Sequence, residues 1–356
     1  ERVIKTLYGF YPRYSHRPQP AHTRHPWLEC AFFAHRVENC YTFYKILQPQ
    51  TPLEPSRKSF IQPSHILPIT NTVALHDHSS IPPPHQQGSN ATNAEPRISP
   101  TTTAREPKRP TQVGKNQLHG GLCGFDKKLW NYNCRENSVE FTTVLSDGEE
   151  GYPGTLRVSV SYRVANGALT ITYDAVSDQD TLCNLTNHSY FNLNGGGTAL
   201  SHTLQIHADR FTENSDQCMP TGKILPVDGT PFDFRAPKPV GRDIGQDDVQ
   251  LRNCGGYDHN FCLADTGALL PAAVLSSAES GVTMRVSTTM PGVQLYAANF
   301  LGPWTGKGGA MYEKRDAVCL ETQFYPNAMQ CEAFRKPVLK AGERYHQVTV
   351  YAFSNK

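Results

Sequence analysis

Hydrophobic and polar residues alternate with a period of two along much of the second part of the chain. The clearest example is the stretch 155–164, where polar residues separate five apolar ones: Leu156, Val158, Val160, Tyr162 and Val164. Successive side chains of a strand point to opposite faces of a sheet, so these five residues would share one face. The pattern predicts a half-buried strand of an antiparallel sheet.

The next residues predict a hairpin. Asn166 and Gly167 follow the first strand directly, and this dipeptide is the strongest short signal for a hairpin turn. A second alternating run, 169–176, then leads back. Similar runs recur later in the chain, at 203–208, 282–288, 293–297, 317–322 and 347–353. No stretch keeps a helical period over ten or more residues, so we expect an all-β domain.

The first part of the chain has a different composition. Residues 1–113 contain 16 of the 27 prolines but only 2 of the 27 glycines. Proline lacks a backbone donor and disrupts both helices and central strands. We therefore divide the chain into a Pro/His-rich segment, 1–113, that is largely irregular or disordered, and a β-sandwich domain, 114–356. The stretch 77–113 is expected to be linker-like.

Charge and hydropathy exclude several classes of protein. A net charge of +2, from 34 basic and 32 acidic residues, argues against nucleic-acid binding. No apolar run approaches the ~20 residues of a membrane span, and the first 30 residues lack the apolar core of a secretory signal. We expect a cytoplasmic protein that contacts no membrane. Its ten cysteines form no CxxC pair, so we expect reduced thiols.

Three polar clusters interrupt the predicted strands. His119 lies beside two glycines, which allow a close backbone approach to a ligand, although it also fits an ordinary turn. His188 lies in a dense polar and aromatic stretch, 187–193, and the alternative there is a buried structural histidine with satisfied hydrogen bonds. Asp258 precedes His259, and here the alternative is a turn stabilised by the aspartate.

Glu321 is the most specific single candidate. It follows the apolar stretch 317–320, and a carboxylate at the end of a buried strand would have the raised pKa of a useful general base. The alternative is a structural carboxylate paired with an arginine. Glu321 could also join His119, His188 and Asp258 in a metal site with two histidines. No HxH or HxxxH spacing supports such a site within 114–356, so we expect no metal.

Six motifs, in this order, resemble the aldose 1-epimerase family, and the resemblance covers 114–356. Two lie before residue 155: Asn116-Gln-Leu-His-Gly-Gly-Leu-Cys-Gly-Phe-Asp-Lys127 and Ser146-Asp-Gly-Glu-Glu-Gly-Tyr-Pro-Gly154. Four follow: Leu185-Thr-Asn-His-Ser-Tyr-Phe-Asn-Leu193, Tyr257-Asp-His-Asn-Phe261, Pro291-Gly-Val-Gln-Leu-Tyr296 and Leu320-Glu-Thr-Gln-Phe-Tyr-Pro-Asn-Ala328. The resemblance implies the large β-supersandwich fold of galactose mutarotase.

The resemblance also implies an activity, the interconversion of the α and β anomers of galactose or glucose by ring opening and reclosure. Glu321 would be the base at O1 and His188 the acid at O5, with His188 kept protonated by a neighbouring carboxylate or by the substrate environment. Acid–base chemistry of this kind needs no cofactor. The implied sugar-binding residues are His119, Asp258, Gln294, Ser189 and Tyr190. We expect a monomer whose only partner is an aldohexose.

The chain departs from the family in its first part. Family members carry several strands and an arginine motif that contacts the sugar before the first of the six motifs, and 1–113 contains nothing comparable. We therefore expect a sandwich without its N-terminal strands and an impaired activity. The main alternative is a non-catalytic, sugar-binding β-sandwich. A related glycosidase would need two carboxylates at the scissile bond and would leave His188 without a role.

Overall fold

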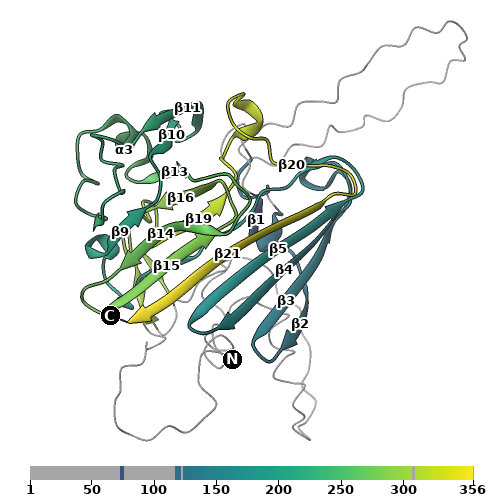
Figure 1. Cartoon of the computed structure of the whole chain (residues 1–356), viewed down its shortest axis with the longest axis horizontal. Helices are drawn as coiled ribbons and strands as arrows, with labels where there is room; N and C mark the ends of the chain where they lie inside the picture. The colour runs from purple at the N-terminus through teal and green to yellow at the C-terminus, as the bar shows by residue number, and fades with distance from the viewer. Residues whose placement is uncertain (1–72, 76–116, 122, 307–308, 356) are drawn as a thin grey trace, which may run out of the picture.

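The computed structural model describes residues 73–75, 117–121, 123–306 and 309–355, and nearly all of its elements are strands (Figure 1). The predicted hairpin is confirmed as β4 (Leu156–Ala165) and β5 (Ala168–Ser177). Asn166 and Gly167 have φ angles of 51° and 72°. Two successive positive φ angles are what a two-residue hairpin turn requires, because that turn matches the twist of the paired strands.

Two large antiparallel sheets account for most of the described strands. The nine-stranded sheet runs, in order, through β12 (Lys238–Pro239), β9 (Thr203–Ile206), β14 (Leu270–Ser276), β15 (Val282–Thr288), β21 (Arg344–Asn355), β5, β4, β3 (Ser138–Leu145) and β2 (Asn131–Arg135). The six-stranded sheet runs through β11 (Pro220–Pro226), β10 (Arg210–Asn214), β13 (Asp258–Cys262), β16 (Gly292–Tyr296), β19 (Val318–Gln323) and β8 (Tyr190–Phe191).

The remaining elements are short. Three small strand pairs are β1 (Val73–Leu75) with β7 (Leu185–Asn187), β6 (Thr181–Leu182) with β20 (Val338–Leu339), and β17 (Trp304–Thr305) with β18 (Met311–Tyr312). The helical elements are α3 (Val249–Cys254) and the single 3-10 turns η2 (Phe125–Lys127), η3 (Glu149–Gly151), η4 (Ala199–Ser201) and η6 (Ala328–Gln330). Over the described ranges, no helix combines the length and apolar character needed to cross a membrane.

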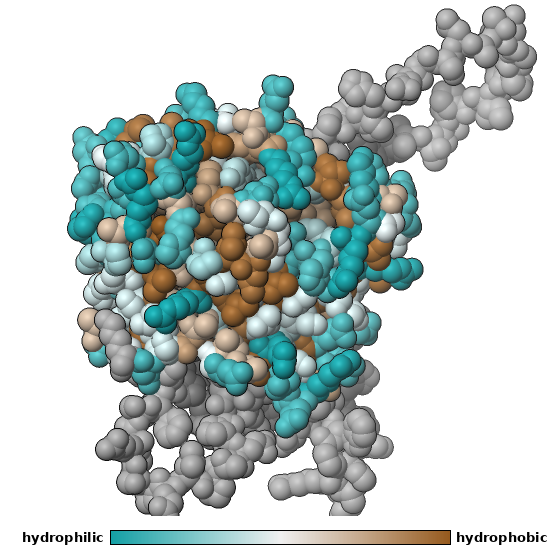
Figure 2. All heavy atoms as spheres, in the orientation of Figure 1, coloured by the Kyte–Doolittle hydropathy of each residue, from teal (hydrophilic) through white to brown (hydrophobic). Residues whose placement is uncertain are grey.

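The two large sheets pack face to face, and the main core lies between them. Val318 and Leu320 of β19 belong to the same buried cluster as Ile171 and Tyr351 of the nine-stranded sheet. Polar groups also bridge the layers, since the Tyr351 hydroxyl donates to the Leu320 carbonyl at 2.9 Å. One face of β19 therefore packs in the core between the sheets, and its other face points away from that core. The viewed side of the molecule shows hydrophobic side chains near its centre and hydrophilic ones around them (Figure 2).

The structure differs from the sequence expectations at β1 and at one pair of cysteines. The segment 1–113 is described only at β1, which pairs antiparallel with β7, so this part of the predicted irregular segment is a strand. The predicted linker 77–113 lies outside the described residues. The expectation of reduced thiols is wrong for one pair, because Cys218 and Cys254 form a disulfide that joins the β10–β11 turn to the end of α3.

Candidate functional site

Glu321 is placed by the alternation of β19. All six residues of this strand are buried, so both of its faces are covered. Because Val318 and Leu320 face the core, Cys319, Glu321 and Gln323 must point to the opposite side. The sequence suggested that Glu321 lies at the end of a strand. In the structure it lies in the middle of β19. This position explains its burial, with a side chain that is only 2% exposed.

The neighbouring strands add polar residues to the same face. Antiparallel register places Gln294 of β16 directly opposite Glu321, and Asn260 of β13 opposite Gln294. A second row runs across the same face, through Asp258, Tyr296, Cys319 and Tyr190. We call this surface of β13, β16, β19 and β8 the site face. Asp258 belongs to a strand, so the alternative of an aspartate-stabilised turn is wrong.

His188 lies between β7 and β8, and both neighbours are anchored. The Asn187 amide donates to the hydroxyls of Tyr173 at 3.2 Å and Tyr351 at 3.0 Å, which ties β7 to the nine-stranded sheet. Asn184 exchanges two hydrogen bonds with the backbone of Phe324, just beyond β19. These contacts fix the segment that carries His188 relative to the strand that carries Glu321.

Aromatic packing fixes the imidazole ring itself. Tyr190 stacks on His188 with ring centroids 4.9 Å apart, and Tyr296 meets it edge-on at 5.8 Å. His119 also approaches edge-on, at 5.5 Å. His119 lies in a tight turn with a φ of 56°, and the neighbouring Gly121 has a φ of 102°. The φ of Gly121 lies in a region that residues with a side chain rarely adopt, so this turn requires glycine here.

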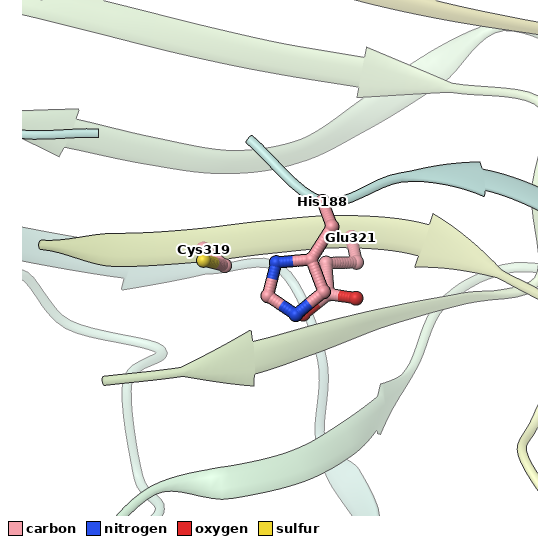
Figure 3. A group of neighbouring side chains, drawn as sticks. All are labelled: His188, Cys319 and Glu321. Atoms are coloured by element: carbon pink, nitrogen blue, oxygen red, sulfur yellow. The ribbon is translucent and has the colours of Figure 1, made fainter. Parts of the chain in front are cut away.

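His188 and Glu321 form the centre of the site. The His188 Nε2 and Glu321 Oε1 atoms are 3.7 Å apart, and the imidazole extends over β19 beside the carboxylate (Figure 3). Burial raises the pKa of Glu321 well above its usual range, and the nearby Asp258 carboxylate raises it further. Burial, together with repulsion from His119, lowers the pKa of His188 to about 3.

Both shifts favour the neutral form of the group, because burial disfavours an ionised carboxylate and a protonated imidazole alike. In the unliganded protein burial therefore opposes a protonated His188, and the expectation that a neighbouring carboxylate or the substrate environment keeps it protonated stays a prediction for the sugar-bound state. An imidazole and a carboxyl group in this arrangement can each act as acid or base.

Asp258 is held by a relay of side-chain amides. Gln294 Nε2 donates to Asp258 Oδ1 at 2.8 Å, and Gln323 Nε2 donates to Gln294 Oε1 at 3.1 Å. Burial raises the pKa of Asp258 to about 6, while the hydrogen bond from Gln294 lowers it. Above about pH 6 Asp258 therefore presents a carboxylate acceptor, held by Gln294, beside the pair.

The structure brings most of the predicted site residues together. His119, His188, Tyr190 and Glu321 are linked by the ring contacts and the short separation given above, and Asp258 and Gln294 join them through the site face. Ser189 is buried at 3% exposure, and its predicted contact with a sugar stays a prediction. The predicted role of Tyr190, to offer a ring face to the sugar, is limited because one of its faces packs on His188.

Four further residues belong to the site face but were not singled out in the sequence; one is Asn260, two positions after Asp258 on β13. Tyr296 and Gln323 lie two residues from Gln294 and Glu321 on the same strands, and Cys319 precedes Glu321 by two. The signal was present in the sequence. A period of two places residues i and i+2 on one face, so each recognised polar residue also marks its neighbours two positions away.

Sequence comparisons place this arrangement among known proteins. The aldose 1-epimerase family model matches residues 101–352. The galactose mutarotase of Sus scrofa is 44% identical over 257 residues, covering 71% of this chain and 74% of the relative. The aldose 1-epimerase of Escherichia coli is 38% identical over 246 residues, covering 67% of this chain and 71% of the relative. The family match begins at residue 101, before the predicted boundary at 113/114.

Two solved structures have a similar fold. The aldose epimerase homologue from C. elegans superposes with a TM-score of 0.63 and 32% identity, covering 69% of this chain and 74% of the other. The galactose 1-epimerase from Lactobacillus acidophilus superposes with a TM-score of 0.61 and 31% identity, covering 69% of this chain and 72% of the other. The predicted galactose mutarotase-like β-sandwich is confirmed.

Proposed function

The chain belongs to the aldose 1-epimerase family of isomerases, and we propose that it interconverts the α and β anomers of galactose and glucose with His188 and Glu321 as its acid–base pair. The predicted enzyme class is supported by the galactose mutarotase and aldose 1-epimerase relatives, and none of them supports the non-catalytic alternative. The observation that carries the residue assignment is the 3.7 Å separation of His188 Nε2 and Glu321 Oε1 on one buried face.

The reaction needs one proton removed and one delivered. Opening a hexose ring requires a base at the O1 hydroxyl and an acid at the ring oxygen O5, after which the C1–O5 bond breaks. Rotation about C1–C2 exposes the other face of the aldehyde, and reclosure reverses both proton transfers. Glu321 removes the O1 proton and His188 protonates O5; on reclosure His188 takes the proton back from O5 and Glu321 returns its proton to O1.

In the proposed cycle, ring opening starts from an ionised Glu321 with a protonated His188 and ends with a protonated Glu321 and a neutral His188. Burial in the unliganded protein favours the neutral form of both groups, which is the state that belongs to the open-chain sugar. We propose that a bound closed hexose favours the charged pair, whose facing atoms are 3.7 Å apart.

Asp258 and Gln294 are the proposed anchors of the sugar. A fixed carboxylate accepts hydrogen bonds from vicinal hydroxyls, and the Gln323–Gln294 relay holds that carboxylate in place. His119 and Tyr190 border the same imidazole. The predicted lack of the family's arginine motif removes a charge-assisted contact worth about 1.5–3 kcal/mol, so we expect weaker sugar binding than in relatives that have it.

Two finer expectations remain proposals. We expect a monomer. We also expect a cytoplasmic location, although the Cys218–Cys254 disulfide is an observation of the kind found in oxidising compartments. Labelling of free thiols in protein taken directly from cells, with and without reductant, would measure whether this pair is joined in vivo.

Polarimetry tests the proposed reaction. Freshly dissolved α-D-galactose should change rotation faster with the purified chain than with buffer alone. Glu321→Gln should abolish the acceleration, because the amide cannot accept the O1 proton. Glu332→Gln is the matched control, since Glu332 is exposed and should leave the rate unchanged. A Glu321→Gln protein with near-normal rates would show that the base is another residue.

A further inference from the structure

Cys319 is a fully buried thiol beside the acid–base pair, and burial raises its pKa well above the usual range. It shares the site face with Glu321 because the two are separated by one residue on β19. The Cys319 sulfur, a Glu321 carboxylate oxygen and a His188 ring nitrogen all lie within 4.8 Å of one another (Figure 3). The ring-opening chemistry described above gives Cys319 no role, so its position needs another explanation.

These three donor types together match one class of ligand. Thiolate, imidazole and carboxylate are the side chains that bind zinc, whereas calcium and magnesium prefer sites made of oxygen alone. Metal–ligand bonds of about 2.0–2.3 Å in a tetrahedron place the ligand atoms roughly 3.3–3.7 Å apart. His188 Nε2 and Glu321 Oε1 are 3.7 Å apart. Since the donor atoms of the three residues all lie within 4.8 Å of one another, no pair would need to close by more than about 1.5 Å.

The surroundings also suit a cation. His188 Nδ1 is buried and has no hydrogen-bond partner among the described residues, so a change in the ring's tautomer breaks no existing bond. Tyr190 and Tyr296 hold the ring in place, which reduces the entropy lost on binding. The Asp258 carboxylate acts electrostatically on Glu321 and adds negative charge nearby. The positive charge of a bound cation would also stabilise the deprotonated, thiolate form of Cys319.

We propose that His188, Cys319 and Glu321 form a binding site for zinc or a similar thiophilic divalent cation, with the fourth position left for water or a sugar hydroxyl. The site would be inhibitory, because the cation occupies both members of the acid–base pair. Binding itself depends only on the geometry of the three side chains. The inhibition depends in addition on the function proposed above, so the two are measured separately.

Metal binding is tested with cobalt and zinc on the full chain. Cobalt is a spectroscopic substitute for zinc, and a thiolate ligand gives it a charge-transfer band in the near ultraviolet. We expect this band in the unaltered protein and in Cys183→Ser, whose cysteine is equally buried but outside the site face. The band should be lost in Cys319→Ser. Zinc titrated against a chromophoric chelator should bind the Cys319→Ser protein at least about ten-fold more weakly.

Cobalt spectra and zinc affinities must be compared between the unaltered protein and its variants, because histidines and cysteines elsewhere in the chain can also bind metals. If Cys319→Ser does not fold, as judged by circular dichroism, His188→Asn provides the second test with the thiol intact. It too should weaken zinc binding by at least about ten-fold. An unchanged cobalt spectrum and zinc affinity in a folded variant that lacks either ligand would overturn the proposal.

Inhibition is measured afterwards by polarimetry. Zinc should slow mutarotation by the unaltered protein and by Cys183→Ser, and a chelator should restore the rate. Relative to its own zinc-free rate, Cys319→Ser should require a higher zinc concentration for the same fractional inhibition. Loss of the cobalt band in Cys319→Ser without any mutarotation by the unaltered protein would support the metal site and contradict the proposed function. Equal zinc sensitivity in both proteins would contradict the inhibitory role.

Discussion

The nine-stranded and six-stranded sheets are built from the same kind of strand but use it differently. In β4 and β5, apolar residues such as Val160 and Ile171 fill the core while polar ones face outward. In β19, both faces are buried, and one of them carries Cys319, Glu321 and Gln323. The first sheet gains stability from its buried face. The second sheet buries groups that would be more stable in water.

This difference separates stability from activity. Buried ionisable groups are destabilising unless they are fully paired, and the raised pKa values of Asp258 and Glu321 measure that desolvation. The same desolvation gives the site its chemistry, because it brings the proton affinities of a carboxyl and an imidazole into competition. Substitutions in the core of the nine-stranded sheet should therefore lower the free energy of unfolding with little change in kcat. Substitutions on the site face should lower activity with little loss of stability.

The largest expected effect is on catalysis, at His188. The His188→Asn substitution removes the acid at O5 but keeps a polar side chain of smaller size. We expect kcat to fall by about 10²–10⁴-fold, the usual contribution of a general acid or base, with weaker but detectable sugar binding. Polarimetry gives the rate, and calorimetric titration gives the binding. A rate within a factor of about two of the unaltered protein would remove His188 from the mechanism.

The next largest effect is on stability, in the nine-stranded sheet. Ile171→Ala creates a cavity at a residue with no exposed surface, so the free energy of unfolding should fall by about 2–5 kcal/mol. The kcat of the remaining folded protein should be unchanged, because Ile171 lies on the core side of the sandwich. Denaturant unfolding and polarimetry on the same sample check both statements. A loss of kcat without a loss of stability would show that packing in the nine-stranded sheet controls the geometry of the site.

A smaller effect is expected at Asp258, and it depends on pH. Folding raises the pKa of Asp258 from 3.8 to about 6, so the folded state binds more protons than the unfolded state between these values. The contribution of Asp258 to the free energy of unfolding therefore decreases as pH rises through this window. Asp258→Asn cannot ionise, and it should be more stable than the unaltered protein above about pH 6.

The expected gain for Asp258→Asn is about 1–2 kcal/mol, below the ~3 kcal/mol that two pKa units represent, because the side chain is partly exposed. The gain should disappear below about pH 4, where both forms of the protein carry a neutral side chain at this position. Thermal unfolding across this pH range measures the difference. A variant that is less stable at neutral pH, or a pH-independent difference, would contradict the assignment of the shift to Asp258.

The smallest effect is expected at the start of the amide relay. Gln323→Leu removes the donor to Gln294, one hydrogen bond worth about 0.5–1.5 kcal/mol. Because Asp258 would be held less firmly, KM for galactose should rise by about 2- to 10-fold with little change in kcat. Steady-state mutarotation rates over a range of galactose concentrations separate the two constants. A fall in kcat alone would place Gln323 closer to the reacting atoms than the relay implies.

The sequence predicted the nine-stranded sheet better than the site. Strict alternation identified β4, β5, β15 and β21, because one face of each strand is apolar. It was less informative for β13, where the polar residues Asp258 and Asn260 lie on the site face and make the strand resemble a turn. Glu321 was recognised, but its place inside a doubly buried strand was not, because that depends on a second layer packing over β19.

The charge state of His188 could not be predicted from the sequence. It depends on how completely the imidazole is buried and on the approach of His119, which is 69 positions earlier in the chain and meets it only in the fold. The Cys218–Cys254 disulfide was missed for a similar reason. Cysteine spacing does not show which thiols the β10–β11 turn and α3 bring together.

The central claim is that Glu321 is buried for catalysis and at the expense of stability. The most direct test measures the rate of galactose mutarotation and the thermal midpoint on the same preparation of Glu321→Gln. We predict that the rate falls to that of buffer alone while the midpoint stays the same or rises, because a neutral amide replaces a buried ionisable group. A protein that keeps its activity, or one that loses activity only because it unfolds, would contradict this account.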